Sequence, residues 1–134
     1  MLNGQQVRHA ILAPVSMGEL LDKISILKIK TERISNPDKR ALAAHELALL
    51  SALLANQGVD TPALANLCDE LRQVNEALWD IEDAIRIKEQ HAAFDEEFIA
   101  LARSVYRTND RRAAIKRQLN EALGSEIVEV KDYA

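Results

Sequence analysis

The chain has 134 residues, of which 48% are hydrophobic but only 4% aromatic, and its formal net charge is −4. This length and composition favour one all-α domain over residues 1–134, with a core of leucine, isoleucine, valine and alanine. The negative charge excludes a general attraction for nucleic acid or an anionic membrane, and the single cysteine, Cys68, excludes an internal disulfide and a zinc site built from thiolates.

The first half of the chain predicts two helices with recognisable ends. Ser16 and Glu19 have the spacing of a capping box, so a helix should begin at Ser16. The Asn36-Pro37 step should end this helix and begin a second one over about residues 37–56, because proline suits the first helical position. Residues 10–13 stand before a proline and are predicted to be extended.

The second half is organised around one long stretch, residues 63–123, which contains no glycine and no proline. Its leucine and isoleucine residues recur three and four positions apart, as on one face of a helix. Because one straight helix of this length would measure roughly 90 Å, we predict an antiparallel hairpin with helices over about 62–91 and 95–123. The fold is then an all-α four-helix bundle. The β-branched tail, 127–130, can pair with residues 10–13 in a short terminal β-ribbon.

Four motifs carry a resemblance to a known family. GELLDKISILKIKTERI, LWDIEDAIR, FIALARSVYRTND and the ending EVKDY resemble a bacterial family described only as a domain of unknown function. The resemblance extends from about residue 11 to residue 133, and residues 44–66 depart from the family pattern. It implies a stand-alone, cytoplasmic bacterial protein and supplies no activity, substrate or cofactor. The polar residues that match the family pattern are Glu19, Asp22, Lys23, Asn75, Trp79, Glu82, Asp83, Arg86, Arg103, Tyr106, Asn109, Asp110 and Lys116.

Polar residues on the two long helices predict a binding site. They recur at helical spacing beside the apolar stripe of each helix, so the two lines can face one groove. There an indole would stack on a ligand, a guanidinium would bind a carboxylate or phosphate, and amides would orient it. The predicted ligand-binding residues are Asn75, Trp79, Glu82, Asp83, Arg86, Arg103, Tyr106, Asn109 and Lys116. The competing interpretation is that the charged residues form ordinary interhelical ion pairs and that Trp79 fills a gap in the packing.

Two pairs of carboxylates stand three positions apart, Glu19 with Asp22 and Asp80 with Asp83. Such pairs can hold Mg²⁺ in helical enzymes, so the alternative function is a small Mg²⁺-dependent enzyme that acts on a phosphorylated or nucleotide ligand. Acids at this spacing are also common on any solvated helix face. The three histidines lie far apart in the sequence. We therefore predict no metal site, no cofactor and no catalytic residue.

These observations favour a non-enzymatic binding or assembly module over an enzyme. Apolar residues cover more than one face of the first two helices, and the hairpin is longer than those helices can cover. We therefore expect a homodimer. The other expected partner is an anionic small molecule or a protein. No apolar run reaches the length of a membrane span, and one cysteine suits a reducing cytoplasm, so we expect a cytoplasmic protein without a membrane or nucleic-acid partner.

Overall fold

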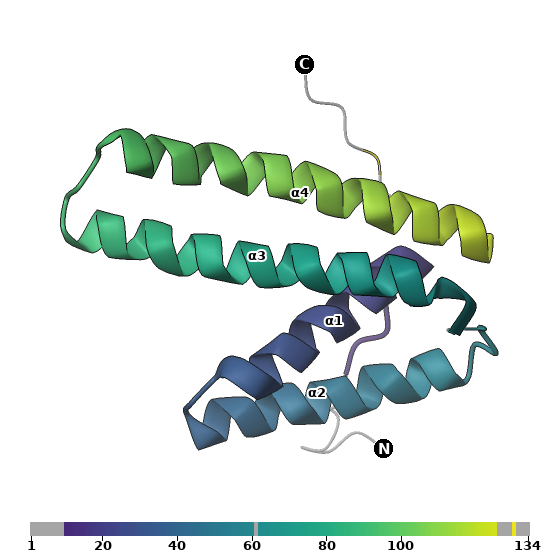
Figure 1. Ribbon diagram of the computed structural model, residues 1–134. Coiled ribbons are helices and arrows are strands. Elements are labelled where there is room, and N and C mark those ends of the chain that lie inside the picture. The colour runs from purple at the N-terminus through teal and green to yellow at the C-terminus, as the bar shows by residue number, and fades with distance from the viewer. Residues whose placement is uncertain (1–9, 61, 126–129, 131–134) are drawn as a thin grey trace.

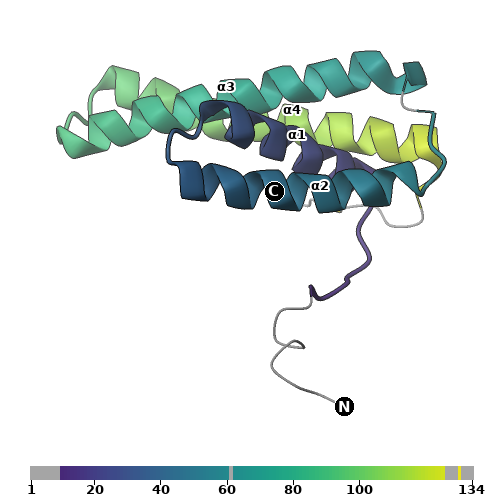
Figure 2. The same ribbon diagram turned by 90° about the horizontal axis from the view of Figure 1, so that it is seen from below.

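The computed structural model describes residues 10–60, 62–125 and 130. The fold is an all-α bundle of four helices, α1 (Met17–Arg33), α2 (Pro37–Ala55), α3 (Ala65–Gln90) and α4 (Glu96–Leu123), with the short 3-10 helix η2 (Pro62–Leu64) before α3. α3 and α4 form the predicted antiparallel hairpin (Figure 1). α1 packs against both helices of the hairpin, and α2 packs against α1 (Figure 2).

Side chains cap three of the helix starts, as the sequence predicts. Ser16 and Asp95 precede α1 and α4, and each side chain accepts the backbone N–H three residues later at 3.0 Å. Asn36 caps α2 by accepting two such bonds, at 3.0 and 3.1 Å. α4 ends at Gly124, whose φ of 61° is left-handed. α3 follows a turn of 3-10 helix instead of starting at residue 62, and the residue before that turn, Thr61, lies outside the described residues.

The apolar core lies where α1 meets the base of the hairpin. Its buried members come from α1, η2 and both long helices: Leu21, Leu64, Leu71, Val74, Ile115 and Leu119. Each such side chain contributes roughly 1.5–3 kcal/mol when it is removed from water. Cys68 packs against this cluster, as expected for a small core residue.

α1 crosses α4 very closely at Gly18. The backbone N–H of Gly18 donates to Oδ1 of Asn120 at 2.7 Å. A Cβ atom at this position would lie 2.5 Å from the backbone oxygen of Lys116, closer than real Cβ contacts allow. Only glycine therefore permits this approach, which brings the first turns of α1, with Glu19 and Asp22, up to Lys116.

The outer half of the hairpin stands apart from the core. None of residues 76–107 is buried, whereas Val74, Asn75 and Thr108, which border this range, all are. We call residues 76–107 the distal arm. Figure 1 shows its outer part, towards the tip of the hairpin, projecting beyond the ends of α1 and α2. The two helices of the arm cover each other over most of its length.

The described residues contain no strand. Ile11 and Leu12, in the segment predicted to be extended, are 95% and 84% exposed. The other half of the predicted β-ribbon falls largely on residues 126–129, which lie outside the described residues, so the ribbon stays a prediction. Within the described part of the chain, none of the helices combines the length and the apolar character that crossing a bilayer requires.

Candidate functional site

A groove of about 360 Å³ opens beside Trp79, between α1 and α3. α3 supplies one wall because positions four, seven and eleven residues apart lie on one face of a helix. Five of the nine predicted ligand-binding residues meet there. The lining residues are Ile26 and Lys30 of α1, Asn75, Leu78, Trp79, Glu82, Asp83 and Arg86 of α3, and Arg112 of α4. We call this cavity the Trp79 groove.

Arg33, the last residue of α1, holds Trp79 from one side. Its guanidinium carbon lies 5.9 Å from the indole centroid, a cation–π distance. Arg33 also pairs with Asp80 at 2.6 Å and with Glu76 at 3.5 Å, and the hydrogen bond to Asp80 is the main cause that raises the pKa of Arg33. The half-buried indole is thus fixed against α1 while it lines the groove.

Three cationic side chains reach the Trp79 groove, and none is held in a tight pair. Arg86 makes one ion pair within α3, 3.3 Å from Glu82, and its side chain is 74% exposed. Nε of Arg112 lies 3.9 Å from a carboxylate oxygen of Asp22. Lys30 forms no ion pair within the described residues. Among the described lining residues, these three cations stand beside two acids, Glu82 and Asp83, so an anionic ligand would meet cationic partners here.

Next to the groove lies a group of polar side chains, of which Asp22, Asn75 and Lys116 are buried and Glu19 and Arg112 are half-buried. We call these five residues the polar cluster. Asp22 and Lys116 are only 2% and 6% exposed. Nζ of Lys116 lies 2.6 Å from the Glu19 carboxylate and 4.0 Å from that of Asp22. Asn75 donates to Asp22 at 2.9 Å. Asn75 and Arg112 belong to both the cluster and the groove, so the two form one continuous site.

Asn75 has one polar atom without a partner. Its side chain is 5% exposed, and its amide nitrogen donates to Asp22 and, at 3.3 Å, to Ser25. With the nitrogen directed at a carboxylate, the amide oxygen is left to accept a hydrogen bond. No donor in the described part of the chain bonds to this oxygen. A buried acceptor left unpaired costs about 1–3 kcal/mol, which a ligand with an N–H or O–H group would offset.

The other four predicted ligand-binding residues lie outside the Trp79 groove. Lys116 is in the polar cluster, Arg103 is exposed on α4, and Asn109 is half-buried. Tyr106 is 54% exposed, with its ring centroid 5.9 Å from the guanidinium carbon of Arg107. The polar residues of the two long helices, which could have faced one groove, are therefore not brought together as a set. α1 faces the α3 residues of the Trp79 groove, and α4 contributes only Arg112.

The four carboxylates considered for Mg²⁺ do not converge. Glu19 and Asp22 belong to the polar cluster, Asp80 pairs with Arg33, and Asp83 lines the groove. No three His, Cys, Asp or Glu residues of the described chain come together as a metal site. A cation bound to Glu19, Asp22 or Asp80 would also have to displace ammonium or guanidinium groups that already neutralise these acids.

Sequence reasoning missed two cations of the groove, Lys30 and Arg112. Arg112 did leave a signal, because it interrupts the apolar stripe of α4 together with Thr108, and a charge in such a stripe must find a polar neighbour. Lys30 left none. Its place in the groove depends on how α1 crosses α3, which no pattern within α1 reveals.

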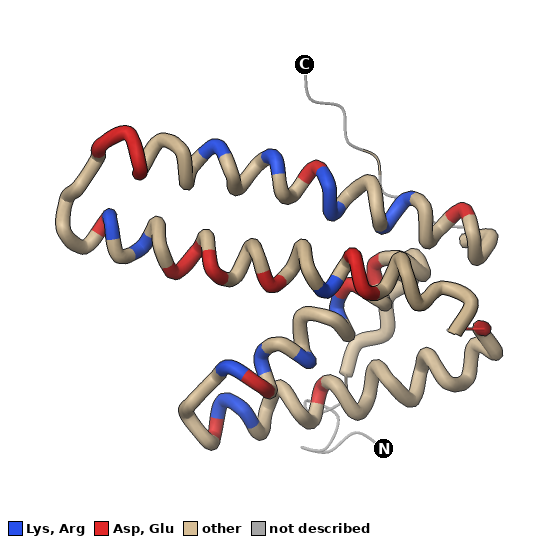
Figure 3. The backbone as a smooth tube through the Cα atoms, viewed as in Figure 1, with Lys and Arg blue, Asp and Glu red and all other residues tan. Residues whose placement is uncertain are grey.

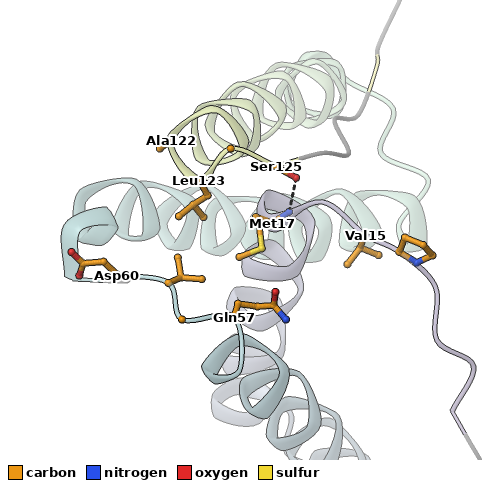
Figure 4. Close-up of a pocket in the computed structure, with 11 residues that line it drawn as sticks. Val15, Met17, Gln57, Asp60, Ala122, Leu123 and Ser125 are labelled. Atoms are coloured by element: carbon orange, nitrogen blue, oxygen red, sulfur yellow. Dashed lines mark hydrogen bonds between the residues drawn. The ribbon is translucent and has the colours of Figure 1, made fainter.

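A larger cavity, of about 640 Å³, lies where the segment before α1, the connection after α2 and the end of α4 meet (Figure 4). There the backbone N–H of Met17 donates to the hydroxyl of Ser125 at 3.3 Å. Asp60 is the one charged side chain among the described residues that line it. The cavity contains none of the predicted site residues and offers no cation to an anionic ligand.

Comparison with known proteins identifies a family and no activity. No curated protein and no solved structure shows significant similarity to the chain. The family of unknown function DUF6165 matches residues 12–134, a range that includes the whole Trp79 groove and the whole polar cluster. The chain therefore belongs to DUF6165, a family of unknown function.

Proposed function

We propose that this chain is a non-enzymatic binding module, that it holds a small anionic ligand in the Trp79 groove, and that it works as a homodimer in the bacterial cytoplasm. The observation that carries the ligand proposal is the Trp79 groove, which is lined by the cations Lys30, Arg86 and Arg112 and by Asn75, whose buried amide oxygen has no donor among the described residues. The cytoplasmic location is supported by the family resemblance and by the single cysteine, and the bacterial origin by the resemblance alone.

The groove defines the chemistry of its ligand. Arg86, Arg112 and Lys30 attract a carboxylate or phosphate, and the guanidinium groups can bind it through two hydrogen bonds each. The indole of Trp79 favours a flat group that stacks on it. The oxygen of Asn75 requires an N–H or O–H donor. The volume of about 360 Å³ is that of a small-molecule site.

Binding is favoured over catalysis because the described lining of the groove holds none of the side chains that most often act as nucleophile and paired base. Its lining residues include no serine, cysteine or histidine. The acids, Glu82 and Asp83, lie on the same helix, and Glu82 already pairs with Arg86. We do not propose the Mg²⁺-dependent alternative, because three of the four candidate acids are neutralised by lysine or arginine.

The fluorescence of Trp79 tests the proposal directly, because Trp79 is the only tryptophan of the chain. The probes are inorganic phosphate, which carries the anion alone, and AMP, which adds a flat base and an amine donor. We expect both to change the fluorescence saturably, with dissociation constants on the order of 1–10 mM for phosphate and lower values for AMP.

Arg86→Ala separates binding from packing. It should weaken AMP binding about tenfold or more, because a charge-assisted hydrogen bond is lost. It should change the free energy of unfolding by less than about 0.5 kcal/mol, because Arg86 is exposed and makes one pair within its own helix. The matched control, Arg103→Ala, removes an exposed arginine outside the groove and should leave AMP binding unchanged.

Two results would overturn the ligand proposal. One is the absence of any saturable change in Trp79 fluorescence with phosphate or AMP. The other is an Arg86→Ala variant that binds AMP as the wild type does. A large loss of stability in Arg86→Ala, with no binding to lose, would instead support the interpretation that Trp79 and its charged neighbours serve packing alone.

A further inference from the structure

The distal arm, residues 76–107, leaves many of its apolar side chains without a partner. Its two helices pack against each other, but no residue of the arm is buried. Ile87, Phe94 and Ile99 are 55%, 59% and 49% exposed. Helices in bundles gain most of their stability by burying an apolar face against neighbours, and two helices alone leave part of each face in water.

One face of the arm is shaped to receive other helices. A groove of about 520 Å³ runs between α3 and α4, and its lining includes Ala84, Ile87, Ala100, Leu101 and Ser104. The small side chains among these let another helix approach closely. Glu82 and Arg86 line the Trp79 groove, and Ala84 lies two positions from each of them. Two positions correspond to a rotation of about 200° around the helix axis. This groove therefore lies on the face opposite the Trp79 groove.

The charges at the edges of this groove suit a second copy of the chain. Nζ of Lys88 lies 2.8 Å from Glu97, which sets these two residues level on the hairpin. Asp80 is then level with residue 105, close to Arg107, and helical spacing puts both at the groove edges, beside Ala84 and Ser104. Asp80 pairs with Arg33 through Oδ1, but its side chain is still 68% exposed. Arg107 forms no ion pair within the described residues. Figure 3 shows that the sign of the charge on each helix changes along the hairpin. In mid-helix α3 is acidic and α4 basic, and near the tip α3 carries basic residues and α4 acidic ones.

We propose that the arm of a second copy docks in this groove, so that the two arms form a four-helix bundle. A twofold axis along the arms places each α3 against α4 of the other copy, with the tips side by side. Asp80 of one copy, which keeps its pair with Arg33, then lies near Arg107 of the other. The Lys88–Glu97 pair of each copy lies level with that of the other copy, with the apolar lining between the two arms. Because this surface lies opposite the Trp79 groove, ligand binding and dimer formation can be tested separately.

α2 carries the other large apolar surface. Leu42, Leu49 and Leu53 are 72%, 50% and 42% exposed and lie on one side of the helix. Glu46 falls on the same side, four positions after Leu42 and three before Leu49. A second copy packed here would have to cover this carboxylate, whereas the two charged residues that line the arm groove, Lys88 and Glu97, already pair with each other. The arm is therefore the better surface for a twofold contact.

Sedimentation equilibrium of the full chain tests the proposal. At about 50 µM the wild type should give a mass of about 30 kDa, twice the 15.0 kDa of one chain. Ala100→Glu places a carboxylate in the groove and should raise the dissociation constant about 100-fold, because symmetry introduces the change twice and each should cost about tenfold. Arg107→Glu should also weaken the dimer. Ala102→Glu is the matched control, on the same helix but the opposite face, and should change nothing.

Several results would overturn the proposal. They are a wild type of 15 kDa, an Ala100→Glu variant as dimeric as Ala102→Glu, and an Arg107→Glu dimer tighter than the wild type. Leu49→Glu tests the apolar surface of α2. If Leu49→Glu dissociates the dimer and Ala100→Glu does not, the contact lies on α2 instead. Circular dichroism checks that Ala100→Glu keeps its helices. If it does not, Ser104→Glu, one turn along the same groove, carries the same expectation.

Discussion

Gly18→Ala should destabilise the fold although alanine is the better helix former. Gly18 lies in the first turn of α1, where that helix crosses α4. Its N–H donates to Oδ1 of Asn120 at 2.7 Å, and the crossing brings Glu19 and Asp22 to Lys116. A methyl group at this position would therefore disturb both the helix contact and the polar cluster.

The structure gives the size of the effect. A Cβ on Gly18 would stand 2.5 Å from the backbone oxygen of Lys116, and ordinary contact begins at 3.4 Å, so α1 and α4 must separate by about 0.9 Å. Such overpacking costs about 1–3 kcal/mol. If the shift also breaks the bond to Asn120, a buried amide loses its acceptor at a further cost of about 1–3 kcal/mol. Against this, alanine gains about 1 kcal/mol of helix propensity. The net loss should be roughly 0–2 kcal/mol if the bond to Asn120 survives and roughly 1–5 kcal/mol if it breaks.

Urea denaturation followed by circular dichroism measures this loss. Gly58→Ala is a suitable control, because its φ of 63° is left-handed but nothing lies within 4 Å of an added Cβ. It should cost only about 1–2 kcal/mol of backbone strain. A Gly18→Ala variant as stable as the wild type, or more stable, would refute the reasoning, because helix propensity alone would then decide the outcome.

Two further predictions concern titrating groups. The Lys88 ammonium, and after it the N–H of Phe98, lower the pKa of Asp95. The stabilisation that Asp95 gives is therefore present at neutral pH and is lost as the pH falls through its lowered pKa. The difference in Tm between wild type and Asp95→Ala should shrink from about pH 6 to about pH 2, and a constant difference would contradict this. Burial raises the pKa of the Cys68 thiol. At about pH 8 iodoacetamide should therefore alkylate Cys68 more slowly than it alkylates the thiol of free glutathione, with both rates followed by mass spectrometry. Equal rates would argue against a raised pKa.

Helix boundaries could be predicted because capping acts within one turn of the chain. Ser16 and Asp95 each bond to an N–H three residues away, so a short pattern contains the whole interaction. The same pattern fails for the partner of a longer side chain. A capping box would turn Glu19 back towards Ser16, yet its carboxylate bonds to Lys116, 97 positions further on. Only the folded crossing at Gly18 makes that pair.

The candidate site, too, could be predicted only where it depends on spacing within one helix. Helical spacing predicts that Asn75, Trp79, Glu82 and Arg86 share a face, and these residues do line one groove. Spacing cannot say which helix covers that face, and in the structure α1 does so. The arrangement follows from the angle at which α1 crosses the hairpin, a property of the packed helices together rather than of any one of them.

The polar cluster raises the question of why charged groups occupy a place that apolar side chains could fill. Asp22→Leu should cost about 3–5 kcal/mol, because Lys116 and Arg112 lose a counter-charge and Asn75 loses its acceptor. Adding Lys116→Met removes one of the stranded charges. The double variant should therefore be more stable than Asp22→Leu alone, by about 1 kcal/mol or more in urea denaturation.

Binding distinguishes a structural role of the cluster from a functional one. Asp22 bonds to Asn75 and lies near Arg112, and both of these residues line the Trp79 groove. The Asp22→Leu/Lys116→Met variant should then fail to bind AMP even where its stability is restored, because the groove loses the carboxylate that orients Asn75 and Arg112. A double variant that binds AMP normally would separate the cluster from the site. Stability losses that simply add would show that Asp22 and Lys116 act independently, and the buried charges would then need another explanation.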